Sequence, residues 1–157
     1  MQVAEGRINR VFTVRLEEGE RLPDCIETLA RRRRIKAALV LLVGGARDGR
    51  LVVGPKKTTA NPAVMVQAFT AGHEILGVGT LFPGEQGPEL HLHVAMGRKQ
   101  KTLVGCIRKG IRTYLIAEIV ILELTGFTAV RARHPVSGFH LLELNRAAPG
   151  SPRFAPS

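Results

Sequence analysis

Short segments rich in Val, Ile and Leu recur along nearly the whole chain, most of them ended by glycine or proline, and they constrain its fold more than any other feature. Such segments are typical of β-strands, because β-branched side chains pack well on a pleated surface. Only one segment has the apolar spacing of a convincing helix. Because strands and helices do not alternate, we expect an α+β protein with a mainly antiparallel sheet and one or two helices.

The expected helix spans residues 23–34. It begins with proline and aspartate, places Ile26, Leu29 and Ala30 at helical spacing, and ends in four arginines that complement the helix dipole. After Lys36, the run over residues 36–45 is apolar without interruption, which predicts a strand buried on both faces. The full set of expected strands is 7–16, 36–45, 48–54, 63–69, 73–82, 90–96, 102–106, 113–124, 126–133 and 138–145.

The chain has 157 residues, enough for one domain that buries a core without cross-links. We expect this domain to span residues 7–144. Residues 145–157 are rich in Pro, Ala and Ser, and this composition predicts a disordered tail.

Cysteine content and hydropathy indicate the compartment. Cys25 and Cys106 are too few for a disulfide framework. The first ten residues, MQVAEGRINR, lack the apolar segment of a signal peptide, and no run approaches the roughly 20 apolar residues of a membrane span. We therefore expect a cytoplasmic protein with no membrane partner.

The segment ELHLHVAMGRKQKTLVGC carries a candidate metal site. On a strand, His91 and His93 point to the same face, roughly 7 Å apart at their Cα atoms. If a hairpin turns between Lys99 and Gln100, Cys106 lies opposite His93. Imidazole nitrogen and thiolate sulfur suit Zn²⁺, and a fourth position would be left for water, a ligand or another residue. The alternative is a half-buried strand with exposed histidines and a small buried cysteine.

Several pieces of the chain occur in the order seen in one known family. They are a first strand ending RLEEGE, a helix, an apolar strand entering GGARDGRL, then HEILGVGTLF, PELHLHVAMG and a late strand AEIVILELTG. With these pieces the chain resembles the PPC domain family, the domain conserved in plants and prokaryotes, from about Arg7 to Leu144. The resemblance implies an α+β fold and a homotrimer. It also often implies a metal site built from a His-x-His pair and a later Gly-Gly-His.

The chain departs from this pattern at the third ligand. His91 and His93 match the pair, but the later motif reads VGC, so Cys106 stands where the family has histidine. A thiolate can replace imidazole on zinc, and the change is equally compatible with a site that has been lost. Glu74, in HEILG, matches a glutamate common in the family. It could act as a general base or as a hydrogen-bond partner of a metal ligand, or it could be an exposed strand residue.

The net charge of +10 favours polyanions such as nucleic acid, although many basic proteins bind none. One stretch between positions 98 and 112 has no acidic residue. Repeated three times in a trimer, it would bind phosphates without reading sequence, or it is a solvated loop. The helix-turn-helix spacing, the aromatic ladder and the Arg-Gly-Arg-Pro hook of DNA readers are missing from the sequence. The candidate phosphate-binding residues are Arg98, Lys99, Lys101, Arg108, Lys109 and Arg112.

Three functions follow from these features. The first is a homotrimeric DNA-associated or regulatory binding module with a metal site, and this is the function that we predict. The second is a small zinc-dependent enzyme in which His91, His93 and Cys106 bind the metal and Glu74 is the base. The third is a trimer that senses a ligand and whose metal or pocket is structural. The sequence does not decide whether the protein is an enzyme.

Overall fold

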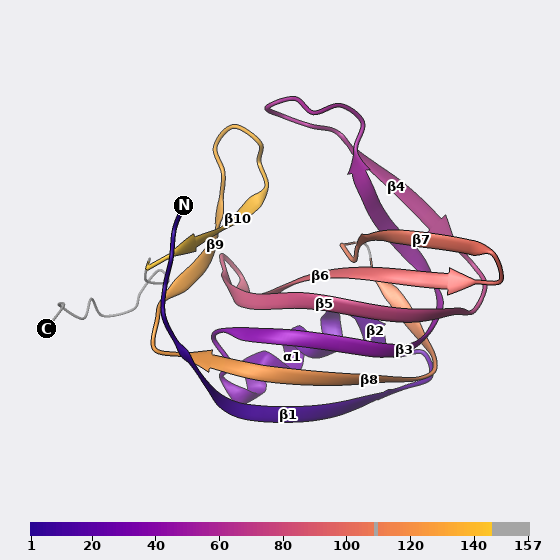
Figure 1. Cartoon of the computed structure of the whole chain (residues 1–157), viewed down its shortest axis with the longest axis horizontal. Coiled ribbons are helices and arrows are strands. Elements are labelled where there is room, and N and C mark those ends of the chain that lie inside the picture. The colour runs from indigo at the N-terminus through magenta and orange to yellow at the C-terminus, as the bar shows by residue number, and fades with distance from the viewer. Residues whose placement is uncertain (109, 146–157) are drawn as a thin grey trace, which may run out of the picture.

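The computed structural model describes residues 1–108 and 110–145, which form one helix and ten strands (Figure 1). The predicted α+β class with a mainly antiparallel sheet is confirmed. The predicted disordered tail lies outside the described residues, apart from Asn145. The elements are β1 (Arg7–Glu17), β2 (Arg21–Leu22), α1 (Asp24–Arg33), β3 (Ala38–Pro55), β4 (Val64–Phe69), β5 (His73–Gly84), β6 (Gly87–Arg98), β7 (Lys101–Cys106), β8 (Ile111–Thr125), β9 (Ala129–Arg133) and β10 (His140–Leu144).

The main sheet has the strand order β1-β8-β3-β5-β6-β7, and all of these pairs are antiparallel. The short strand β2 pairs with β8, and β4 pairs with β3. β9 and β10 form a separate hairpin. Neighbours in the sheet are mostly not neighbours in sequence, so most contacts are long-range.

The strand expected over residues 48–54 is part of the long strand β3 and not a separate element. The register with β8 shifts between Gly44 and Gly45 and again between Ala46 and Asp48, and such bulges bend a strand instead of ending it. Gly44 has φ +146°, and a Cβ there would lie 2.6 Å from the Cα of Ala117, so this bend needs glycine. Beyond the bend, β3 pairs with β4, and Val52 lies opposite Cys106 of β7.

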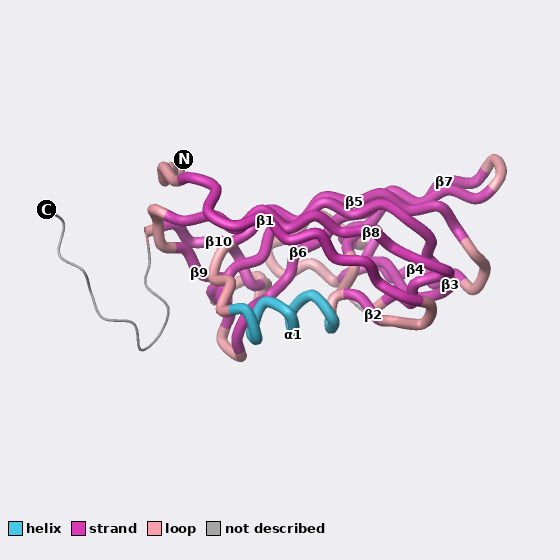
Figure 2. Tube along the Cα trace, turned by 90° about the horizontal axis from the view of Figure 1, so that it is seen from below, coloured by secondary structure: helices cyan, strands magenta, loops and turns pink. Residues whose placement is uncertain are grey.

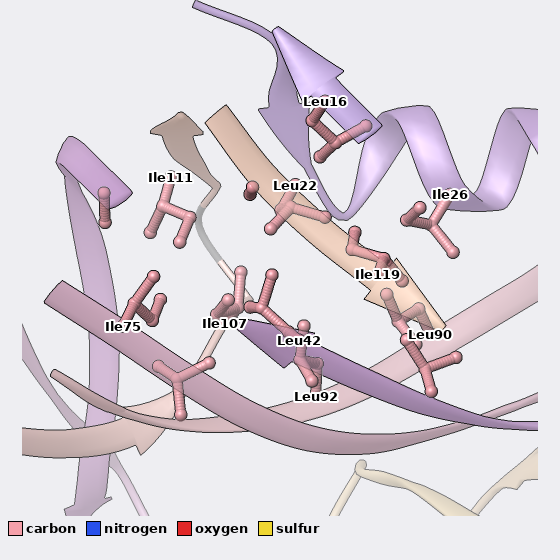
Figure 3. Close-up of a cluster of buried hydrophobic side chains, with 14 of the residues drawn as sticks. Leu16, Leu22, Ile26, Leu42, Ile75, Leu90, Leu92, Ile107, Ile111 and Ile119 are labelled. Atoms are coloured by element: carbon pink, nitrogen blue, oxygen red, sulfur yellow. The ribbon is translucent and has the colours of Figure 1, made fainter. Parts of the chain in front are cut away.

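Helix α1 covers one face of the sheet (Figure 2). Ile26 and Ala30, four residues apart, are completely buried against that face. Burial of a side chain such as Ile26 contributes about 1.5–3 kcal/mol. Arg34 closes the helix in a left-handed conformation, and its N–H bonds to the Ala30 and Arg31 carbonyls. The core beneath the helix includes Leu16, Leu22, Leu42, Leu90, Leu92 and Ile119 (Figure 3).

Most of the opposite face of the sheet is uncovered by the described elements of this chain (Figure 2). The exception is the end of β5, where Phe82 packs with Ala129 of β9 and Thr80 accepts hydrogen bonds from Arg131. Residues 36–45 were therefore expected wrongly to be buried on both faces. Val40 and Leu42 are buried, but Leu41 and Val43 are 38% and 55% exposed. The apolar run fills one face with core residues and leaves its alternate residues facing outward, as a strand of period two requires.

Candidate metal centre

The β6–β7 hairpin positions the candidate ligands. His93 pairs with Cys106 and Arg98 pairs with Lys101, so the predicted hairpin register is confirmed. On β6 the histidines alternate with the buried side chains of Leu92 and its apolar neighbours, which point into the core. This alternation forces both imidazoles onto the outer face, where the Cys106 side chain also lies because paired residues share a face.

The three ligand atoms converge. Nε2 of His91 lies 3.0 Å from Nε2 of His93. One ring nitrogen of each histidine and Sγ of Cys106 all lie within 4.8 Å of one another. Two nitrogens on a tetrahedral zinc, each 2.0–2.1 Å from the ion, are separated by about 3.3 Å. A small outward rotation of one ring and an approach of the sulfur would therefore admit the ion. Within the described part of the chain this group contains three ligand residues, which leaves a fourth coordination position open.

The environment of the cluster also suits a metal. Burial lowers the pKa of His91 to about 4, and the charges of Arg131, His93 and Arg108 act in the same direction. His91 is therefore neutral at pH 7, with a lone pair available for coordination. Cys106 is buried and His93 is exposed, so the site is reached from the outer face of the sheet. The donor set and the geometry fit Zn²⁺.

Glu74 lies on the outer face but is not part of this cluster. It is exposed on β5 opposite Gly97, whereas His93 lies opposite Val78, four residues farther along β5. Four residues of strand correspond to about 13 Å. The structure therefore does not bring Glu74 within hydrogen-bonding reach of the ligands.

Two residues that the sequence analysis did not select lie next to the cluster. Glu89 shares the outer face of β6 with His91, and Nδ1 of His140 lies 2.7 Å from its carboxylate. His140 is half-buried in this contact. The spacing Glu-x-His-x-His, at positions 89 to 93, was the sequence signal for Glu89. His140 had no comparable local signal.

Arg131 is the third residue that the sequence analysis missed. Its side chain comes from β9, is only 4% exposed, and donates from Nη2 to the carbonyl oxygen of Thr80 at 3.2 Å and to the Thr80 hydroxyl at 2.7 Å. Thr80 lies directly opposite His91 in the β5–β6 pair. Burial lowers the pKa of the Arg131 guanidinium, since a charged group is costly to desolvate.

The predicted basic segment does not form one patch. Arg98, Lys99 and Lys101 are exposed at the β6–β7 turn, at one end of the sheet (Figure 1). Arg108 lies 5.0 Å over the ring of Phe139, and Lys109 lies outside the described residues.

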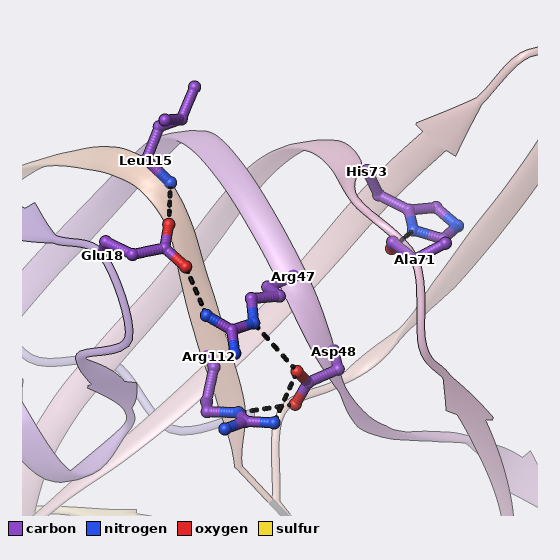
Figure 4. A network of polar contacts seen from close by, with 7 residues as sticks. All are labelled: Glu18, Arg47, Asp48, Ala71, His73, Arg112 and Leu115. Atoms are coloured by element: carbon purple, nitrogen blue, oxygen red, sulfur yellow. Dashed lines mark hydrogen bonds and ion pairs between the residues drawn. The ribbon is translucent and has the colours of Figure 1, made fainter.

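Arg112 was predicted to bind phosphate, but it is already engaged. Its Nε and Nη2 donate to the carboxylate of Asp48 at 2.8 and 2.7 Å (Figure 4). Arg47 joins Asp48 to Glu18, which also accepts the backbone N–H of Leu115 at the β8 bulge. This network pairs the charge of Arg112 with Asp48 within the protein and links Arg112 to the bulge of β8.

Comparison with known sequences gives two matches. A sequence model of the Plants and Prokaryotes Conserved (PCC) domain matches residues 3–125. The bifunctional protein GlmU of a Synechococcus strain is 29% identical over 153 residues. That alignment covers 93% of this chain but only 23% of the length of the relative.

Several crystal structures share this fold. A metal-containing protein from Archaeoglobus fulgidus has a TM-score of 0.80 at 22% identity, over 91% of this chain and 99% of that chain. A plant- and prokaryote-conserved protein from Pyrococcus horikoshii has a TM-score of 0.78 at 20% identity, over 91% and 97%. A candidate DNA-binding protein from Bacteroides thetaiotaomicron has a TM-score of 0.75 at 18% identity, over 90% and 99%. No helix in the described part of this chain is long and apolar enough to cross a membrane.

Proposed function

The chain belongs to the Plants and Prokaryotes Conserved domain family, and from this we propose that it is a homotrimeric binding module whose His91, His93 and Cys106 hold a zinc ion. The observation that carries the proposal is the convergence of three ligand atoms within 4.8 Å of one another. The name of the Archaeoglobus fulgidus neighbour, a metal-containing protein, agrees with it. A bound zinc ion would supply a Lewis-acidic position for a fourth ligand.

Elemental analysis of the purified full chain tests the zinc centre. We expect about one zinc ion per chain in the wild type after zinc is supplied, and almost none in a His91→Ala/Cys106→Ser double variant. His134→Ala is the matched control, because His134 is exposed in the β9–β10 loop and its ring nitrogen Nδ1 contacts Ser137, away from the cluster. Wild-type protein that takes up no zinc would contradict the proposal.

The uncovered sheet face supports assembly of several copies. Leu41 lies opposite Val78 and Val43 lies opposite Leu76, so four outward apolar side chains adjoin on β3 and β5. Val104 on β7 extends the same face, and these five side chains are between 38% and 60% exposed. An apolar face of this kind favours coverage by a partner. We propose that other copies of this chain cover it, as the homotrimer of the family implies.

The zinc centre lies at the margin of this apolar face. Val78 pairs with His93, and Val104 is two residues from Cys106 on β7. Subunits that meet on the face would shield the exposed imidazole of His93 from bulk water. Assembly and metal binding would then stabilise each other.

Association with DNA is the second candidate. It is supported by the net charge of +10, by the exposed cations of the β6–β7 turn, and by the Bacteroides thetaiotaomicron neighbour. The exposed arginines at positions 31–34, at the end of α1, add a second cationic group that the sequence analysis attributed to the helix dipole alone. Scattered cations of this kind bind phosphates and not base edges, so binding would be independent of DNA sequence.

The zinc-dependent enzyme is less well supported than the binding module. A hydrolytic zinc site needs a general base within hydrogen-bonding reach of the reacting water. Glu74 lies about 13 Å from the cluster along β5. Glu89 lies closer, but His140 engages its carboxylate. These positions favour a site that binds a ligand.

A further inference from the structure

Arg131 is a buried cation that no ion pair among the described residues neutralises. Its buried Nε has no hydrogen-bond partner there, and its hydrogen bonds to described residues are both made through Nη2, to Thr80. A buried guanidinium is normally paired, because leaving a buried charge unpaired is strongly unfavourable. The Nε–H group of Arg131 can therefore still donate a hydrogen bond to an anion.

The guanidinium of Arg131 lies next to the candidate metal centre. The β9–β10 hairpin lies beside the end of β5 and β6 where these strands are joined (Figure 1). Thr80, which holds the guanidinium, is the cross-strand partner of His91, so the two side chains stand next to each other on the outer face. The charge of Arg131 also interacts with Cys106, which agrees with a guanidinium that faces the cluster.

The surrounding charges leave the site positive. Arg108 is exposed, lies over Phe139 and interacts electrostatically with both His91 and Arg131. The nearby acid, Glu89, attracts Arg131 electrostatically, but its carboxylate is engaged by His140 at 2.7 Å. With zinc bound to two neutral imidazoles and one thiolate, the centre would carry one further positive charge. An anion at the open position would balance these charges.

We propose that the open side of the His91–His93–Cys106 centre binds a small oxyanion, a carboxylate or phosphate group, held by the guanidinium of Arg131 with Arg108 as a second cation. The planar fork of arginine matches the two oxygens of such a group and donates to both. This inference rests on the proposed zinc centre, since the metal would bind one oxygen of the same ligand. The class of partner is therefore a small organic acid or a phosphorylated metabolite.

Titration calorimetry with sodium acetate and with inorganic phosphate tests the inference, on zinc-loaded and zinc-free protein against sodium chloride of equal ionic strength. We expect saturable binding of at least one anion to zinc-loaded wild type. Saturation by acetate alone would indicate carboxylate ligands, and saturation by phosphate alone would indicate phosphorylated ligands. Arg131→Lys should weaken the affinity by about tenfold or more, because lysine keeps the charge but loses the fork.

Controls separate binding from folding and from the zinc proposal. Arg108→Gln removes an exposed cation beside the site and should weaken binding without lowering the melting temperature, whereas Arg98→Gln at the distant turn should leave the affinity unchanged. Zinc uptake without saturable anion binding would overturn the inference and leave the zinc centre intact. Anion binding unaffected by Arg131→Lys and Arg108→Gln would also overturn it. Failure to take up zinc, in contrast, contradicts the proposed function itself.

Discussion

Cys106 lies directly opposite His93 of β6 and, on its other side, directly opposite Val52 of β3. The backbone that carries the thiol is therefore held between two strands, and the side chain is buried. A ligand held in this way loses little freedom when it binds a metal, which favours a preorganised site.

The Cys106 thiolate should give a spectroscopic signature. Cobalt(II) in the wild-type protein should show the near-ultraviolet charge-transfer band of a thiolate ligand. Cys106→His restores the ligand type of the family, so it should still bind cobalt but without this band. Cys106→Ser should bind cobalt weakly or not at all. Absorption titration with cobalt checks all three proteins, and a band that persists in Cys106→His would contradict the assignment.

A substitution at Gly79 should disturb the close packing of β5 against β6, the strand that carries the histidines. A Cβ at Gly79 would lie 2.6 Å from the carbonyl oxygen of His91 and 2.9 Å from the Cα of Leu92, so Gly79→Ala must displace β6. We expect a loss of about 1–3 kcal/mol in the free energy of unfolding and weaker zinc binding.

Gly97→Ala is the matched control for this change. At Gly97 the nearest atom to a new Cβ is the Lys101 carbonyl oxygen, 4.0 Å away. Its effect on unfolding should stay within about 0.5 kcal/mol. Urea unfolding and zinc titration measure both variants, and equal effects of the two substitutions would argue against the steric explanation.

A charge on the uncovered sheet face should dissociate the assembly. Val78 is 55% exposed in the single chain and is one of the four outward apolar side chains that adjoin on β3 and β5. Val78→Lys should convert the trimer to monomers, because burying an unpaired ammonium is costly. Val136→Lys, in the exposed β9–β10 loop, should leave the mass unchanged. Light scattering after size exclusion gives the mass, and a monomeric wild type would refute the trimer.

The Arg10–Glu123 pair should make the free energy of unfolding depend on pH. Glu123 accepts hydrogen bonds from Arg10 at 2.6 and 2.7 Å and from Asn9 at 2.8 Å. The Arg10 hydrogen bonds hold the pKa of Glu123 below its usual value. This stabilisation is therefore complete above about pH 4.3, the usual pKa of glutamate, and is lost as the pH falls through the lower folded value.

Glu123→Gln should therefore lower the free energy of unfolding at pH 7 by about 1 kcal/mol. The difference in the free energy of unfolding between this variant and the wild type should become smaller below pH 4. Glu85→Gln, in the exposed β5–β6 turn, is the control and should have little effect at either pH. Urea unfolding at pH 7 and pH 3 checks the prediction, and a difference that is independent of pH would contradict it.

DNA association should depend on the β6–β7 turn. Replacing Arg98, Lys99 and Lys101 by glutamine should weaken binding to any duplex and reduce the slope of log affinity against log salt by about 1 for each phosphate that these cations neutralise. Lys56→Gln/Lys57→Gln, in the exposed β3–β4 loop, removes charge elsewhere. Fluorescence anisotropy at several salt concentrations measures the slopes. Equal reductions per charge in both variants would mean that net charge, and not the turn, attracts DNA.

The local pattern of the sequence was enough for the hairpin that carries the metal ligands. The alternation of apolar residues with His91 and His93 defines which face each residue occupies, and the polar turn at Lys99 and Gln100 defines the register. Together these two features place Cys106 opposite His93. Both features are local because a strand has a period of two and a short hairpin loop fixes the pairing of its strands.

The other parts of the site depended on tertiary structure. Arg131 reaches Thr80 only because the β9–β10 hairpin folds back onto β5. Asp48 pairs with Arg112 of a neighbouring strand, although the two residues are 64 positions apart in sequence. No local period encodes such contacts. Leu41 and Val43 gave the same apolar signal as their buried neighbours. The hydrophobic pattern indicates that both faces of the strand favour burial. Only the packing of α1 determines which of the two faces is buried within this chain.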